Sequence, residues 1–167
     1  MIRQAMAVVG LAALAIPAGI QAQDTEWNRY TLEELGGVYV SSEIAEPCVA
    51  AGVSDASLRS GADVVLGAAE VELLTEMGML ANPALPELRL SVDCAPSDGG
   101  IVFTVSVRMH QAVQMVRDPQ ITLSEAVTWY ASSVGIAAAD GVSAAVGSAV
   151  EAQVGAFAVA YTEANAG

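Results

Sequence analysis

Lysine is absent from this 167-residue chain, and histidine and cysteine are scarce. Six arginines oppose 19 acidic residues, which sets the formal net charge at −13 at pH 7. A chain this acidic repels phosphate backbones and gains nothing from counterion release, so we predict no nucleic-acid partner. It is an equally poor match for anionic lipid surfaces. Solubility is the simpler explanation of the charge, and attraction of a cationic partner is the alternative.

The scarcity of histidine limits the chemistry that the chain can support. His110 is the single histidine, and no cluster of cysteines or carboxylates with metal-ligand spacing surrounds it. The sequence has neither a Gly-x-Ser-x-Gly elbow nor a glycine-rich phosphate loop that follows a strand. We therefore predict no metal, no cofactor and no assigned catalytic residue. A hydrolase that pairs His110 with a distant serine stays as a less favoured alternative.

The N-terminus resembles a secretory signal peptide. Arg3 precedes an apolar run, and Ala22 supplies a small residue at a plausible cleavage site. We predict a signal peptide over residues 1–22 and a single domain over residues 23–167, located in the periplasm or secreted. A retained membrane anchor is the alternative for the first segment, and no membrane insertion is expected once it is removed.

Two cysteines remain in the expected mature chain, and an even count in an exported protein favours a disulfide between Cys48 and Cys94. A reactive thiol needs a basic neighbour that lowers its pKa, whereas Glu46 and Asp93 are acidic.

Hydrophobic periodicity predicts the order of helices and strands. Apolar residues alternate in four segments, 38–45, 88–94, 101–116 and 124–134, which we expect to be strands. Helical spacing predicts a short helix within 24–35, a long one over 52–78 and a last one after Asp140. Ser54 and Asp140 are the expected N-caps of the two long helices, and Gly78 the expected end of the first.

The first strand, the long helix and the second strand form a crossover unit, which makes the two strands parallel neighbours. Cys48 and Cys94 then lie at coinciding strand ends, which supports the disulfide. Each strand has one apolar face, so the helices belong on that face. The prediction is an α+β fold of two layers, with a four-stranded mixed sheet in the order β-α-β-β-β-α along the chain.

The polar face of this sheet is the candidate binding surface. Alternation collects Arg89, Arg108, His110 and Tyr130 there, together with Ser91, Thr104, Ser106 and Thr128. An ordinary solvated sheet face explains the same pattern without a function. The functional interpretation is a docking face for a partner, a second copy or an anionic ligand.

The carboxyl-terminal part of the chain resembles small uncharacterised exported bacterial proteins. The motifs are Arg117-Asp118-Pro119, Thr128-Trp129, Val134-Gly135, and a last helix with Phe157 and Tyr161 ahead of Asn165. The last helix is poorer in charge than the usual amphipathic one. The resemblance implies a periplasmic α+β domain without an assigned activity, and no catalytic residue carries over. The layout is also similar, more loosely, to small domains of cell-envelope assembly proteins.

These observations lead to one functional hypothesis and one main alternative. The hypothesis is a non-enzymatic periplasmic domain that binds an envelope protein or a small ligand through its open sheet face. The alternative is a structural homo-oligomer of the cell envelope that is buried through the same face.

Overall fold

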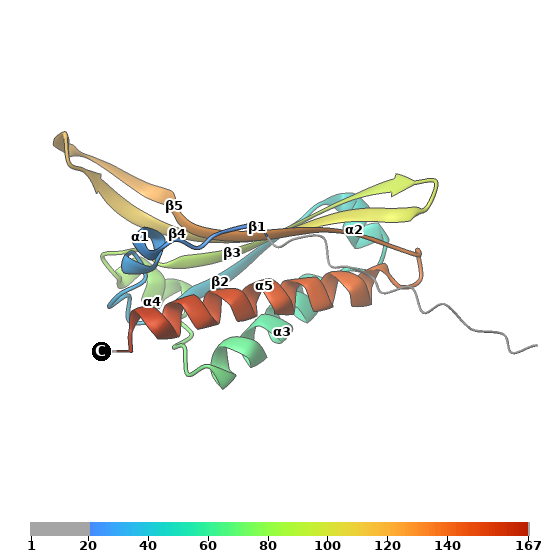
Figure 1. Cartoon of the computed structure of the whole chain (residues 1–167), viewed down its shortest axis with the longest axis horizontal. Coiled ribbons are helices and arrows are strands. Elements are labelled where there is room, and N and C mark those ends of the chain that lie inside the picture. The colour runs from blue at the N-terminus through green and yellow to red at the C-terminus, as the bar shows by residue number, and fades with distance from the viewer. Residues whose placement is uncertain (1–20, 167) are drawn as a thin grey trace, which may run out of the picture.

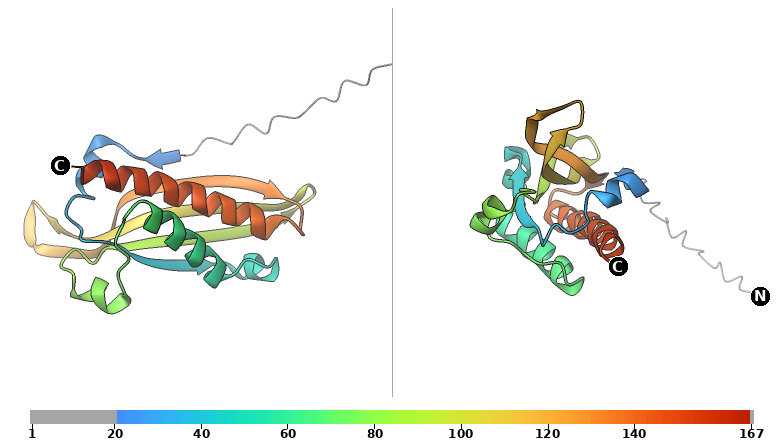
Figure 2. Two further views of the ribbon diagram at one scale, coloured as in Figure 1. Left: turned by 90° about the horizontal axis from the view of Figure 1, so that it is seen from below. Right: turned by 90° about the vertical axis from the view of Figure 1, so that its left-hand side faces the viewer.

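The structure is a computed structural model that describes residues 21–166; the predicted signal peptide lies almost wholly outside this range. Figure 1 shows an elongated sheet with two long helices, α3 and α5, along one face, and Figure 2 shows the same layer from below. The described strands are β1 (Gln21–Gln23), β2 (Tyr39–Ile44), β3 (Glu87–Ser97), β4 (Gly100–Met115) and β5 (Asp118–Ala137). The described helices are α1 (Glu26–Tyr30), α2 (Glu46–Ala50), α3 (Asp55–Ala68), α4 (Glu76–Ala81) and α5 (Val142–Ala164).

The predicted fold class is confirmed. Strands β2 to β5 are the four expected strands of a mixed sheet, in which β2 and β3 run parallel and the other pairs antiparallel. A short additional strand, β1, pairs with the outer edge of β5, so the described sheet has the order β1-β5-β4-β3-β2. Cleavage after Ala22, as predicted, would fall within β1.

Alternating apolar residues form the core side of the sheet. Leu88, Leu90 and Val92 of β3 are buried, and so are Val107 and Met109 on β4. The pairing of β4 with β5 is irregular, because its register shifts between Met109 and His110 and again between Gln111 and Val113. Such a shift adds a residue to one strand and bends the ribbon locally.

The long helix predicted over residues 52–78 is wrong beyond Ala68. Ser54 does cap α3, accepting a hydrogen bond from the Ser57 N–H at 3.3 Å. The chain then turns at Glu70, whose φ is +58°. The next residues lie beside the start of β2, where the Val38 N–H donates to the Glu72 carbonyl at 2.9 Å. These contacts compete with continuation of the helix, although the apolar spacing runs on without a break.

Several helix ends differ from the predictions because caps depend on local geometry. Gly78 lies inside α4 rather than ending a helix, and its N–H donates to Thr75, which caps α4. Pro47 lies in the first turn of α2, where proline fits because the backbone N–H there needs no partner within the helix. The first helix is capped by Thr25. The N-cap position of α5 is Gly141, one residue after the expected Asp140.

The predicted disulfide is present and joins α2 to β3. Cys48 and Cys94 are bonded, with their Cα atoms 5.2 Å apart. The parallel register pairs Ile44 with Val92, so the two strand ends coincide as expected. The bridge therefore follows from the crossover topology.

Helix α5 packs its predicted apolar stripe against the sheet and α3. Val142, Val146, Val150, Val154 and Phe157 are fully or almost fully buried, and the Phe157 ring meets Trp129 of β5 at 5.2 Å between centroids. By length and composition alone this helix, with a mean hydropathy of 1.4, is apolar enough to cross a membrane.

Candidate binding face

The face of the sheet opposite α3 and α5 carries the predicted row of polar residues. The register sets Arg89 of β3 beside Ser41 of β2 and opposite Arg108 of β4, which in turn lies opposite Tyr130 of β5. Figure 1 shows no helix across the middle of this face within the described residues. The alternation of polar and apolar residues along each strand was thus sufficient to predict this row.

Arg89 is held by three carboxylates. Its guanidinium donates two hydrogen bonds to Glu87, at 2.7 and 3.2 Å, and lies 3.5 Å from Glu43 and 3.6 Å from Glu125. The hydrogen bonds to Glu87 raise the pKa of Arg89 further. This arginine is already neutralised within its own domain, so an incoming anion would have to displace carboxylates to reach it.

The Glu87 carboxylate is the anchor of this cluster. Burial alone would raise its pKa, but the hydrogen bonds from Arg89 and from the Ser41 hydroxyl outweigh it, and the pKa of Glu87 is lowered. Glu87 therefore stays ionised at neutral pH and fixes the Arg89 side chain across the strand.

His110 lies on the same side but is buried, with 8% of its surface exposed, which corrects the expectation of a solvent-facing residue. It lies between Glu87 on one neighbouring strand and Val127 on the other. Burial and the nearby Arg89 charge lower its pKa, so the ring is neutral. Neither ring nitrogen has a hydrogen-bond partner of normal geometry. The nearby Glu125 backbone opposes the lowering of the pKa but does not outweigh it.

Arg108 contrasts with its neighbour. It is exposed, and within residues 21–166 it forms no ion pair. Tyr130, half-buried, lies directly across the strand boundary. Toward the β3–β4 turn the face becomes apolar, with Val134 and Ile136 exposed on β5. An unpaired cation beside an aromatic ring and an apolar strip can bind a carboxylate attached to an apolar group.

The alternative function, a hydrolase that uses His110, is not supported by any catalytic pair among the described residues. No serine or threonine hydroxyl is hydrogen-bonded to His110 in the part of the chain that the structure describes. The same residues contain no group of three histidine, cysteine or acidic side chains able to hold a metal ion. Thr128, which was expected on the polar face, is the extra residue of the β5 bulge and contacts the Gln111 amide.

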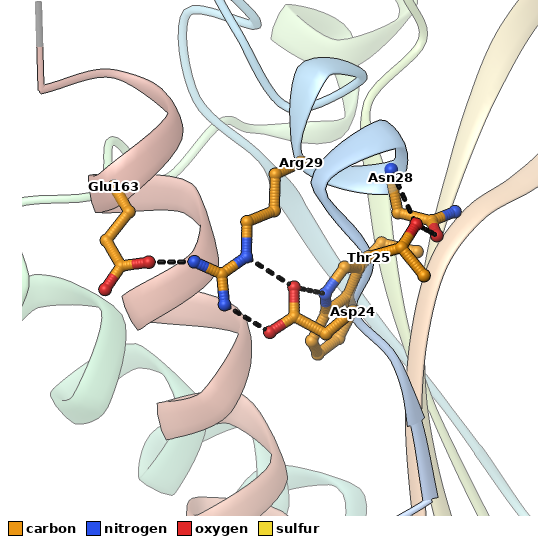
Figure 3. A network of polar contacts seen from close by, with 6 residues as sticks. Asp24, Thr25, Asn28, Arg29 and Glu163 are labelled. Atoms are coloured by element: carbon orange, nitrogen blue, oxygen red, sulfur yellow. Dashed lines mark hydrogen bonds and ion pairs between the residues drawn. The ribbon is translucent and has the colours of Figure 1, made fainter.

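A second polar network, shown in Figure 3, joins the two ends of the domain. Arg29 of α1 donates to both oxygens of Asp24, at 2.7 and 2.6 Å, and also pairs with Glu163 near the end of α5. The indole N–H of Trp129 donates to Asp24 at 3.3 Å. Because its charges satisfy one another, this network is structural. Trp27 of α1 lies outside this network and is 80% exposed.

The sequence reasoning missed the acidic members of the binding face. Glu87 lies two residues before Arg89 on the same strand, so alternation places both on one face. Glu43 lies two residues after Ser41 on β2, so the two residues share one face of the sheet. Glu125 could not be assigned in this way, because the bulge at Thr128 breaks the alternation between it and Tyr130.

Comparison with known proteins gives a similarity of fold and no family. No family model matches the chain, and no curated protein matches it. Two crystal forms of the PelC dodecamer from Paraburkholderia phytofirmans, one of a point variant, have a similar fold. The variant has a TM-score of 0.48 at 15% identity, covering 82% of this chain and 96% of that one. The other has a TM-score of 0.47 at 16% identity, covering 82% and 94%. These similarities carry no inference about function.

Proposed function

We propose that the protein is a non-enzymatic, exported binding domain whose uncovered sheet face docks an envelope protein that presents a carboxylate. The observation that carries the proposal is Arg108, an exposed cation without an ion pair among residues 21–166, at the centre of that face. Export rests on the N-terminal sequence pattern, and a disulfide suits an oxidising compartment.

The surroundings of Arg108 favour a specific contact over simple solvation. Arg89 is locked by its own carboxylates, which leaves Arg108 free to bind an external one. The half-buried Tyr130 and the apolar Val134 and Ile136 supply area that excludes water from such a pair. Interfaces are typically enriched in arginine and tyrosine around an apolar centre.

A homo-oligomer buried through this same face is less favourable. It would bring the Glu43, Glu87 and Glu125 clusters of two copies together, and like charges brought together across an interface cost several kcal/mol. We therefore assign this face to a different protein.

Site-specific photocrosslinking in the cell envelope tests the proposal. A photoreactive residue at Tyr130 should capture a discrete protein, whereas one at Val64, exposed on α3, should not. Arg108→Glu should reduce the capture at least tenfold, which corresponds to about 1.4 kcal/mol. Arg117→Glu, the same charge change on another exposed arginine, should leave it intact. Equal capture from Val64, insensitivity to Arg108→Glu, or capture of a second copy would each refute the proposal.

A further inference from the structure

The β4–β5 hairpin extends past the helical layer as an arm formed by residues 112–126 (Figure 1). Its tip carries Val116, which is 99% exposed, and Arg117, which is exposed and has no ion pair within the described residues. An apolar side chain that is fully exposed beside an unpaired cation has no role in the core. We call these two residues the tip.

An apolar cavity lies at the opposite end of the molecule. It has a volume of about 440 Å³. The lining includes Pro47 and Ala51 of α2, Pro96 and Ile101 of the β3–β4 hairpin, and Ala139 before α5. Figures 1 and 2 place these segments at one end of the sheet and the arm at the other.

Three exposed acidic residues neighbour the cavity lining along the chain, and we call them the rim. Glu46 precedes a lining residue of α2, Asp98 lies in the β3–β4 turn, and Asp140 follows Ala139; all three are exposed. No arginine belongs to the cavity lining. An apolar cavity with an acidic rim is complementary to an apolar knob followed by an arginine, which is the composition of the tip.

We infer that the tip of one copy docks into the cavity of a second copy. Val116 would enter the apolar cavity, and Arg117 would pair with the acidic rim, Asp140 above all. Asp118, next to the tip, accepts a hydrogen bond from the Gln120 N–H at 3.1 Å. This contact uses neither Arg108 nor Tyr130 and is independent of the proposed docking face.

The contact is head-to-tail, because tip and cavity are different surfaces at opposite ends of one chain. A heterologous contact of this kind leaves one tip and one cavity unused in every open chain of copies. Such assembly grows into a closed ring or an extended filament, depending on the rotation between neighbours. A contact on a two-fold axis would instead stop at a dimer.

Sedimentation and light scattering on the protein without its signal peptide test this inference. The wild type should exceed the monomer mass at micromolar concentration, and Val116→Asn should reduce it to a monomer. Ala139→Arg should do the same from the cavity side, as should Asp140→Arg, which reverses a rim charge on an exposed residue. The matched control is Val64→Asn, an exposed valine on α3, which should assemble as the wild type does.

Mixing the variants distinguishes a heterologous contact from any other. Val116→Asn retains a working cavity and Ala139→Arg a working tip, so together they should form a one-to-one dimer and nothing larger. Melting temperatures close to that of the wild type establish that each variant is folded. A monomeric wild type, an assembled Val116→Asn variant, or a mixture that stays monomeric would overturn the inference. Arg108→Glu should leave assembly unchanged, so the two proposals fail separately.

Discussion

Three residues of the candidate face show how position separates side chains with similar charge. Arg89 and Arg108 lie directly opposite each other, yet Arg89 is bound by three carboxylates and Arg108 by none within the described residues. His110, on the same side, is buried and neutral. Only Arg108 therefore remains available to a partner, although the sequence pattern presents all three alike.

The buried His110 predicts a dependence of stability on pH. Burial lowers the pKa of His110 in the folded state, and the Arg89 charge adds to the effect. In the unfolded chain the pKa of His110 is about 6.5. Its contribution to stability is complete above that pH and is lost as the pH falls through the folded pKa, because the unfolded chain takes up the proton first. Urea unfolding should show a larger loss of stability between about pH 7.5 and 5.5 for the wild type than for His110→Gln. Identical losses would contradict this assignment.

Among the elements, the crossover from β2 to β3 was predictable, and so was its internal helix except for the position of its C-terminal end. The strands and the disulfide follow from alternation and from the right-handed parallel connection. The end of α3 depends on Glu72 and Leu74, whose backbones bond to Val38, more than 30 residues earlier. No periodicity within the helix region records that contact.

The disulfide should dominate the stability of this crossover. It closes a loop of 46 residues between α2 and β3, which the chain-entropy model values at about 4 kcal/mol. Reduction should therefore lower the urea midpoint substantially, and a Cys48→Ala, Cys94→Ala double variant should match the reduced protein. The double variant should not respond to reductant. A wild-type midpoint that reductant leaves unchanged would show that the bridge adds little.

At the scale of the whole molecule, the network of Figure 3 holds the N-terminal segment and the end of α5 together. Asp24→Asn removes the Arg29 pair and weakens the bond from Trp129, so it should lower the unfolding free energy by about 1–3 kcal/mol. Glu163→Gln is the matched control, since Glu163 is more exposed than Asp24 (57% against 24%) and its exposed ion pair is worth up to about 1 kcal/mol. If urea unfolding showed the same loss of unfolding free energy for both variants, Asp24 would have no special role in the network.

The whole molecule also separates its two proposed surfaces. The docking face is built from the middle of four strands, whereas the tip and the cavity lie at the two ends of the long axis. Much of this arrangement could be predicted, because Arg108 and Tyr130 follow from strand alternation. The cavity could not, since its lining comes from α2, two strands and the loop before α5.

The sequence by itself determined the properties that depend on residue type and near-neighbour spacing. These are the acidic charge, the apolar faces of the strands, the stripe of α5 and the pairing of Cys48 with Cys94. The tertiary structure alone decided where α3 ends, that His110 is buried, that β1 extends the sheet, and that the arm projects beyond the helices. The physical reason is that each of these depends on contacts between residues far apart in the chain, which no local pattern encodes.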